Sequence, residues 1–286
     1  MFFKFFSRIK LYLVIVMTMA LLRDESVESY LAPDNQVMSA VSSAPSPRAK
    51  MANVPMIEAK LRRPDTGGAI VQHRLLELLG RSARNHSGTL VVGRAGSGKT
   101  TLAAEYAAGV AGSVWYSIDA GDADWHLFAK YFTALILGKS KARNPRRKPT
   151  EARTPLELFA DLTAGLELVG AEWPTLMVLD GAHHLFDSEW FPQFFQFMIA
   201  SMQPPTHVLV LSRSKPPTPL WRLRSKQVLN VIDEKVLAFS PAEADEFFAR
   251  HGLGKREAAS AHKLSFGQAG KLAGLLDSRI KNQSAR

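Results

Sequence analysis

The residues best suited to chemistry stand in one run, Gly93-Arg94-Ala95-Gly96-Ser97-Gly98-Lys99-Thr100. This run satisfies the pattern of a phosphate-binding loop, or P-loop. Its glycines let the backbone curl so that successive N–H groups point at an anion, and the following helix adds its positive N-terminal end. Lys99 then reaches the β- and γ-phosphates, while the Thr100 hydroxyl binds Mg²⁺. We predict a nucleotide site over residues 93–101, Thr101 included, with Arg94 solvated rather than catalytic.

A carboxylate placed to complete such a site follows an apolar run further along the chain. Asp180 ends the run TLMVLD, as a Walker-B aspartate does at the carboxyl end of a buried strand. Its role there is to hold Mg²⁺, partly through water. The P-loop upstream favours this role over that of an aspartate which only caps a turn. Thr100 and Asp180 are therefore the predicted metal ligands.

The position after Asp180 bears on hydrolysis. Many hydrolysing P-loop proteins carry a second acid there to orient the attacking water, but this chain has Gly181. The next candidates are His183, His184 and Asp187. Histidine can act as a general base near neutral pH, although a histidine after a strand more often serves a turn or packing. The sequence therefore predicts nucleotide binding with slow or absent hydrolysis, and leaves weak ATPase activity open.

An arginine closes another apolar run, HVLVLSR, at Arg213. A guanidinium group matches the oxygens of a phosphate, so Arg213 is a candidate sensor of the γ-phosphate. The plainer interpretation is a surface arginine at a strand terminus. With Lys99 and Asp180, Arg213 completes the predicted catalytic set.

The elements that must position these residues alternate in type. Short apolar runs predict strands buried on both faces, as in a parallel sheet; they cover residues 89–92, 113–118, 175–179, 207–211 and 227–232. Patterns of helical period lie between them, within 56–84 and over 98–110, 125–137, 155–169 and 191–202. This alternation indicates an α/β fold with a doubly wound sheet.

The pattern becomes purely helical from Pro241 onward. Ser240 and Glu243 form a capping box at the start of this part. We therefore expect a P-loop domain over residues 51–239 and a small helical, lid-type domain over 240–286.

One aromatic cluster lies in the predicted helix 191–202. Phe191, Phe194, Phe195 and Met198 recur at helical spacing and are expected in the core. Trp190 and Phe197 fall off this stripe, so their exposure is left open, and a docking surface is the alternative to core packing for this cluster.

Composition excludes several classes of protein. The chain has 286 residues, of which 46% are apolar and 22% charged, so whole-chain disorder is ruled out. It has no cysteine, which removes disulfides, thiolate zinc sites and cysteine nucleophiles. The net charge of +10 favours anionic partners. Residues 139–153 hold seven basic side chains and one acid; without interleaved aromatics they indicate a solvated loop rather than a nucleic-acid or lipid contact.

The first fifty residues read as an extension followed by a linker. The apolar run over residues 11–22 is shorter than the about 20 residues that span a bilayer, and it resembles a signal peptide without a cleavage site. Residues 31–50 are rich in Ser, Ala and Pro, as linkers are. Two interpretations stay open: Met51 is the true start, or the apolar segment is a membrane anchor. We expect a cytoplasmic protein, with membrane association through residues 1–22 as the alternative.

The span from about Met56 to Leu276 resembles the ATPase module of MalT-like, LuxR-type regulators of the STAND class. The matching segments are KLRRP, RLLELL, GRAGSGKTTLAAEYA, VWYSIDAGDAD, LMVLDGAHHLF, VLVLSRSKPPTPLWRLRSKQVL and LAFSPAEADEFFARHG. The resemblance implies an AAA+-like P-loop fold with sheet order 5-1-4-3-2, in which Asp180 and Arg213 flank the P-loop strand. It also implies a tightly held ATP or ADP with Mg²⁺, which acts as a conformational switch.

The chain departs from this family at three places. Gly181 replaces a second acid, and Phe266-Gly267-Gln268 stands where a Gly-Trp-Pro-like turn is common. The family's helical-repeat sensor and its DNA-binding helix-turn-helix are not in this sequence, so neither inducer recognition nor DNA binding is carried over. Output would then pass through a protein partner or self-association.

Two other functions stay open. One is a non-catalytic scaffold that keeps ADP as a structural ligand, which the missing second acid favours. The other is a small-molecule P-loop kinase, but residues 139–153 precede the Walker-B strand, where a basic lid is not expected.

Overall fold

The computed structural model describes residues 56–67, 72–141, 152, 154–202, 204–216, 223–224 and 226–284. The predicted N-terminal extension and most of the basic loop 139–153 lie outside these ranges. Within them, none of the helices has the length and apolar character needed to cross a membrane.

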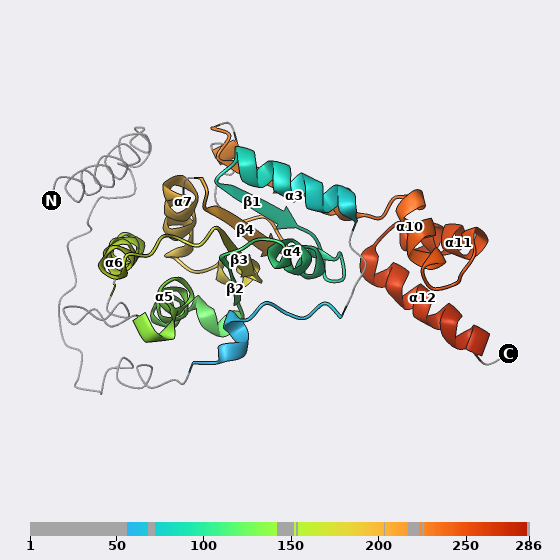
Figure 1. The fold of residues 1–286 in the computed structure, drawn as a ribbon, viewed down its shortest axis with the longest axis horizontal. Coiled ribbons are helices and arrows are strands. Elements are labelled where there is room, and N and C mark those ends of the chain that lie inside the picture. Colours follow the sequence, from blue (N-terminus) through green and yellow to red (C-terminus); the bar gives the residue numbers. More distant parts are fainter. Residues whose placement is uncertain are drawn as a thin grey trace, which may run out of the picture. The chain divides into compact units, whose positions relative to one another are not determined.

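The described ranges form one parallel sheet of five strands (Figure 1). Its order is β2-β3-β4-β1-β5, which confirms the predicted order 5-1-4-3-2. The strands are β1 (Gly88–Val92), β2 (Ser113–Ser117), β3 (Leu176–Asp180), β4 (His207–Ser212) and β5 (Leu229–Ile232). The three inner strands β1, β3 and β4 are short, apolar and largely buried, as the continuous apolar runs predict, whereas the edge strands β2 and β5 each bury two residues.

Alternate residues of each strand point to opposite sides of the sheet. Both faces of the sheet are therefore apolar, and helices cover each of them. On one face, Val91 and Val178 pack against α3 (His73–Asn85) and α4 (Lys99–Ala108). On the other face, Leu90 and Met177 share a core with the remaining helices of the domain. These are α5 (Trp125–Lys141), α6 (Pro155–Val169) and α7 (Phe191–Ser201). The 3-10 helices are η2 (Glu58–Leu61), η3 (Ala120–Ala123) and η5 (Ala182–Leu185).

Helix α7 buries its aromatic cluster. Its predicted stripe is buried, but Phe197 is buried as well, with 4% of its surface exposed. Trp190 is half-buried; its indole N–H donates to the Ala123 carbonyl at 3.0 Å, and its ring lies 4.7 Å from that of Phe128. Neither residue is exposed, because α7 packs against α6 as well as the sheet, which confirms core packing over a docking surface.

The segment before α3 is tied to the edge strand β2 by an ionic cluster. Lys60 of η2 lies 2.7 Å from Asp119 and 2.8 Å from Asp122. Asp122 is completely buried, so the Lys60 ammonium is its charge partner in a site that water does not reach. The KLRRP segment thus has a structural role at the sheet edge.

Replacing Lys60 by methionine is expected to lower the free energy of unfolding by about 3 kcal/mol, because a buried carboxylate is left without its partner. Urea denaturation followed by circular dichroism measures this loss. The matched control is Arg62→Ala, which removes an exposed ion pair with Glu58 and should change stability by less than about 0.5 kcal/mol. Equal effects of the two variants would contradict the account.

A buried polar chain joins the amino ends of three strands. The Nδ1–H of His207 donates to the His86 carbonyl at 2.9 Å, so Nε2 accepts from the Thr89 hydroxyl at 3.0 Å. Ser82 then donates to Thr89 at 2.6 Å and accepts from Asn230 at 3.0 Å. Burial lowers the pKa of His207 to about 4. The neutral imidazole is therefore the form that this part of the fold requires.

The free energy of unfolding should accordingly fall as the pH is lowered. A histidine with its ordinary pKa of 6.5 when unfolded and about 4 when folded contributes fully above pH 6.5 and loses its contribution as the pH falls to 4. This loss amounts to about 1 kcal/mol per pH unit. Denaturation midpoints measured between pH 7 and 4 should fall less steeply for His207→Gln than for the exposed control His251→Gln. An unchanged slope for His207→Gln would contradict this assignment.

The C-terminal helices enclose a core of their own. They are α9 (Glu234–Leu237), α10 (Pro241–Ala249), α11 (Lys255–Ser265) and α12 (Ala269–Ser284), and Phe239, Phe248 and Leu272 are buried among them. The predicted capping box is present: Ser240 accepts from the Glu243 N–H at 3.2 Å, and Glu243 accepts from the Ser240 N–H at 2.8 Å.

Candidate phosphate-binding site

The P-loop joins the carboxyl end of β1 to the start of α4. Gly96 and Gly98 have φ of 74° and 87°, in the left-handed region that side chains disfavour. A Cβ on Gly93 would lie 2.7 Å from the Ser97 hydroxyl. The three glycines of the motif are therefore required by the shape of the loop.

Lys99 lies within the loop that precedes it. Its ammonium donates to the carbonyls of Gly93 at 2.6 Å and Arg94 at 2.9 Å, and to the Ser97 hydroxyl at 3.1 Å. The residue is 8% exposed, and this burial lowers its pKa, against the opposing charge of Asp180. A phosphate at the loop would meet a cation that is already desolvated and held by the loop itself.

Thr100 and Asp180 meet although they are 80 residues apart. The Thr100 hydroxyl donates to the Asp180 carboxylate at 2.9 Å. Burial raises the pKa of Asp180, while the Thr100 hydrogen bond and the charge of Lys99 oppose the rise. A hydroxyl beside a carboxylate is a donor set of the kind that Mg²⁺ takes beside a phosphate. The residues present therefore fit that ion.

A cavity of about 430 Å³ brings the predicted residues together. Strands β3, β4 and β1 are neighbours, so their carboxyl ends open on the same edge of the sheet. Arg213 is exposed and lines this cavity, as do His183 and His184; Asp187 is not among its lining residues. The predicted residues that line it are Ala95, Gly96, Gly98, Lys99, Thr100, Thr101, Asp180 and Arg213.

Gly181 has a backbone conformation that a second acid does not fit. Its φ is 89°, and a Cβ there would lie 2.4 Å from the Ile118 carbonyl oxygen. The Gly181 N–H is bonded to the Leu211 carbonyl at 3.2 Å, and the Ile118 N–H to the Asp180 carbonyl at 2.7 Å. The backbone is thus held on both sides, so the position cannot take an acid without moving.

His183 lines the same cavity without a bonding partner among the described residues. Both of its ring nitrogens are buried and unpaired, and its ring lies 4.2 Å from that of His184. Burial, followed by the nearby charges of His184 and Arg213, lowers the pKa of His183 to about 4. The imidazole is neutral at physiological pH, which makes it a weak proton acceptor in the protein as it stands.

Three residues that were not predicted from the sequence also contact the loop. Glu234, the first residue of α9 and two residues after β5, accepts from the Arg94 backbone N–H at 3.1 Å and from its guanidinium at 3.0 Å. Gly270 of α12 donates its N–H to the Gly96 carbonyl at 2.7 Å, and Gln268 donates to the Ala95 carbonyl at 3.3 Å. An acid after the last predicted strand was a usable signal for Glu234, because neighbouring parallel strands end at one edge.

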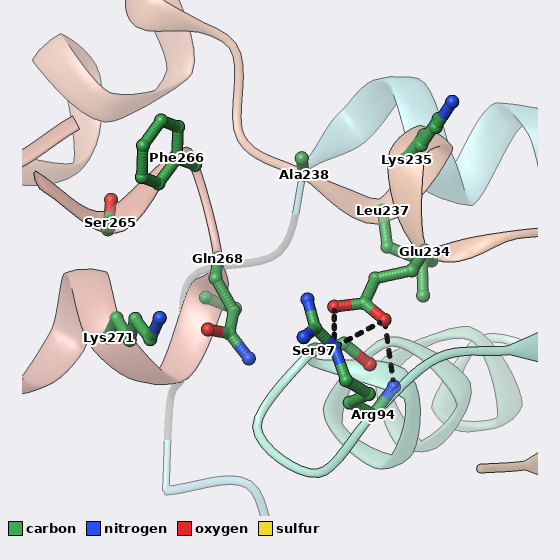
Figure 2. A pocket seen from close by; sticks show the side chains of 11 residues that line it. Arg94, Ser97, Glu234, Lys235, Leu237, Ala238, Ser265, Phe266, Gln268 and Lys271 are labelled. Carbon is green, nitrogen blue, oxygen red and sulfur yellow. Dashed lines mark hydrogen bonds and ion pairs between the residues drawn. The ribbon is translucent and has the colours of Figure 1, made fainter. Parts of the chain in front are cut away.

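A second cavity, of about 570 Å³, lies between the loop and the C-terminal helices (Figure 2). Arg94 and Ser97 form one wall with Glu234, while Phe266 and Gln268 stand opposite. The loop is thus the shared wall of two cavities, one at the strand ends and one beneath the C-terminal helices.

The family model of the AAA ATPase domain matches residues 71–211. This chain contains a P-loop ATPase module. The match covers the loop and Asp180 and ends just before Arg213. An AAA ATPase domain implies nucleotide binding, usually with Mg²⁺.

A solved structure of low sequence identity shares the fold of this ATPase module. A Signal Transduction ATPase with Numerous Domains (STAND) protein with a tetratricopeptide repeat sensor, from Pyrococcus horikoshii, matches with 19% identity and a TM-score of 0.50, over 72% of this chain. The chain spans only 29% of the length of that protein. A Walker-type ATPase of Pyrococcus abyssi matches with 15% identity and a TM-score of 0.49, over 77% of this chain and 73% of its own.

Proposed function

We propose that this ATPase module is a nucleotide-dependent switch in signal transduction, of the kind found in MalT-like regulators of transcription. Residues 93–101 hold the phosphates of ATP or ADP, Thr100 and Asp180 hold Mg²⁺, and Arg213 meets the γ-phosphate. The bound ion offsets the negative charge of the phosphates. The module acts in the cytoplasm and passes its state to a protein partner or a second copy.

The contact of α12 with the loop is the observation that carries the switch. The Gly270 N–H is bonded to the Gly96 carbonyl at 2.7 Å, and a Cβ on Gly270 would lie 3.0 Å from the same oxygen. A phosphate that draws the N–H groups of the loop toward itself must turn peptide units at Gly96. Such a turn breaks this bond or moves α12 with it, so the helical domain responds to what the loop holds.

Hydrogen exchange tests this coupling. The full chain, stripped of nucleotide, is compared with its ADP and ATP–Mg²⁺ forms by mass spectrometry. We expect amide protection in the first turn of α12 to differ at least about threefold between the nucleotide-free form and the nucleotide-bound forms, because local opening free energies follow the state of the contact. Identical protection in α12, together with nucleotide protection of the loop itself, would contradict the switch.

Slow or absent hydrolysis follows from Gly181 and His183. The backbone of Gly181 leaves no room for a water-orienting acid, and the lowered pKa of His183 makes it a poor substitute. The same observation favours the second candidate, a scaffold that keeps ADP as a structural ligand. Turnover and exchange together separate the two functions: phosphate release at background rate, with bound ADP that does not exchange for ATP, supports the scaffold, whereas slow turnover or ready exchange supports the switch.

A further inference from the structure

The linker between the sheet and the C-terminal helices is held by two side chains at the start of α3. Gln72 donates to the Leu237 carbonyl at 3.1 Å, and the Arg74 guanidinium donates to the carbonyls of Val236 at 3.0 Å and Ala238 at 3.1 Å. Carbonyls at the end of a helix such as α9 have no partner within that helix. Gln72 and Arg74 thus fix three successive peptide units of the linker, and we call this pair the α3 latch.

Arg74 of the latch also contacts the first helix of the helical domain. Its guanidinium donates to the Glu243 carboxylate at 3.2 Å, and Glu243 belongs to the capping box that begins α10. Helix α3 itself is fixed on the sheet, because Leu75 and Leu79 are buried in the core that it shares with the strands. One arginine therefore ties the sheet, the linker and the first turn of α10 to each other.

The helical domain is also bonded to the P-loop. The Gly270 N–H donates to the Gly96 carbonyl at 2.7 Å, and Gln268 donates to the Ala95 carbonyl at 3.3 Å. Helices α10, α11 and α12 share one core, so the latch at α10 and the loop contact at α12 act on the same packed unit. A movement of the loop that carries α12 with it therefore has to strain the latch.

We propose that the α3 latch is autoinhibitory: it keeps α12 on the P-loop and thereby lowers the affinity of the module for nucleotide. The proposal rests on the proposed function, in which a bound phosphate turns the peptide units at Gly96. That turn either breaks the bond to Gly270 or moves α12, and a latched linker opposes the movement. Release of the latch lets α12 follow the loop, so the binding-competent form is populated more and the apparent affinity rises.

Arg74→Ala is the test variant, because it removes the bonds to the linker and to Glu243 together. Arg74→Lys keeps the charge opposite Glu243 but lacks the planar fork that donates to several acceptors at once. The matched control is Arg81→Ala, which lies on the same helix and removes an exposed ion pair with Glu77. Isothermal titration of the full chain with ADP and ATP–Mg²⁺ measures the affinities, and urea denaturation checks that each variant is folded.

We expect Arg74→Ala to bind both nucleotides at least about fivefold more tightly than the wild type, Arg74→Lys to gain less, and Arg81→Ala to bind as the wild type does. A residue that only stabilises the fold would not give a gain.

A second background tests whether the latch acts through α12. In Gly270→Ala the added Cβ, 3.0 Å from the Gly96 oxygen, already separates α12 from the loop, so Arg74→Ala should gain less there. Unchanged or weaker binding by folded Arg74→Ala, or an equal gain in both backgrounds, would overturn the latch. Absence of nucleotide binding by both the wild type and Arg74→Ala would instead overturn the proposed function, and this proposal with it.

Discussion

Replacing Lys99 by alanine is expected to weaken ATP and ADP binding at least about 100-fold. The ammonium is desolvated and donates to the Gly93 and Arg94 carbonyls and the Ser97 hydroxyl, so a bound phosphate can take over donors that already lie inside the loop. Charge-assisted hydrogen bonds of this kind contribute about 1.5–3 kcal/mol each, and more than one is lost. Isothermal titration with ATP–Mg²⁺ measures the change.

The control for this variant is Lys255→Ala, which removes an exposed lysine at the start of α11. Its affinity should equal that of the wild type, and both variants should keep a cooperative unfolding transition. Tight nucleotide binding by folded Lys99→Ala would show that the P-loop is not the phosphate site.

Replacing Gly181 by aspartate is expected to destabilise the protein rather than to create an active ATPase. Sequence logic alone suggests that the missing second acid would restore hydrolysis. The structure indicates otherwise, because the left-handed backbone and the Ile118 carbonyl oxygen, 2.4 Å from a Cβ, both oppose a side chain. We expect a loss of about 3 kcal/mol of unfolding free energy, measured by urea denaturation, without a rise in phosphate release.

Gly274→Ala is the matched control, because an added Cβ there meets no atom within 4 Å and helix α12 gains a better helix former. It should leave stability unchanged or raise it slightly. A stable Gly181→Asp protein that hydrolyses ATP faster than the parent would contradict our account of this position.

The sequence alone was sufficient to predict the features that repeat along the chain or that form a contiguous motif. The glycines of residues 93–98 allow the left-handed backbone conformations of a P-loop, so the motif predicts the loop. Strands such as β3 and β4 are predicted by apolar runs that are too short to form helices. The meeting of Thr100 with Asp180 follows from parallel topology, since Walker-B and P-loop strands end at one edge.

The contacts that the sequence did not reveal are long-range and carried by single residues. Gly270 contacts Gly96 through its backbone N–H. Nearly every residue type has this group, so the residue type does not predict the contact. Gly181 was visible as a departure from the usual pattern, but the reason, a close approach of the Ile118 carbonyl, requires coordinates. The burial of Phe197 was left open because a helical stripe predicts one buried face, whereas α7 packs on more than one.

The most direct test of the central claim is calorimetric titration of the full chain with ATP and ADP, with and without Mg²⁺, after removal and quantification of co-purified nucleotide. The account predicts binding at one site per chain, with micromolar or tighter affinity, that becomes stronger with Mg²⁺ because Thr100 and Asp180 are placed to bind the ion. Absence of binding by protein with an intact unfolding transition would contradict it.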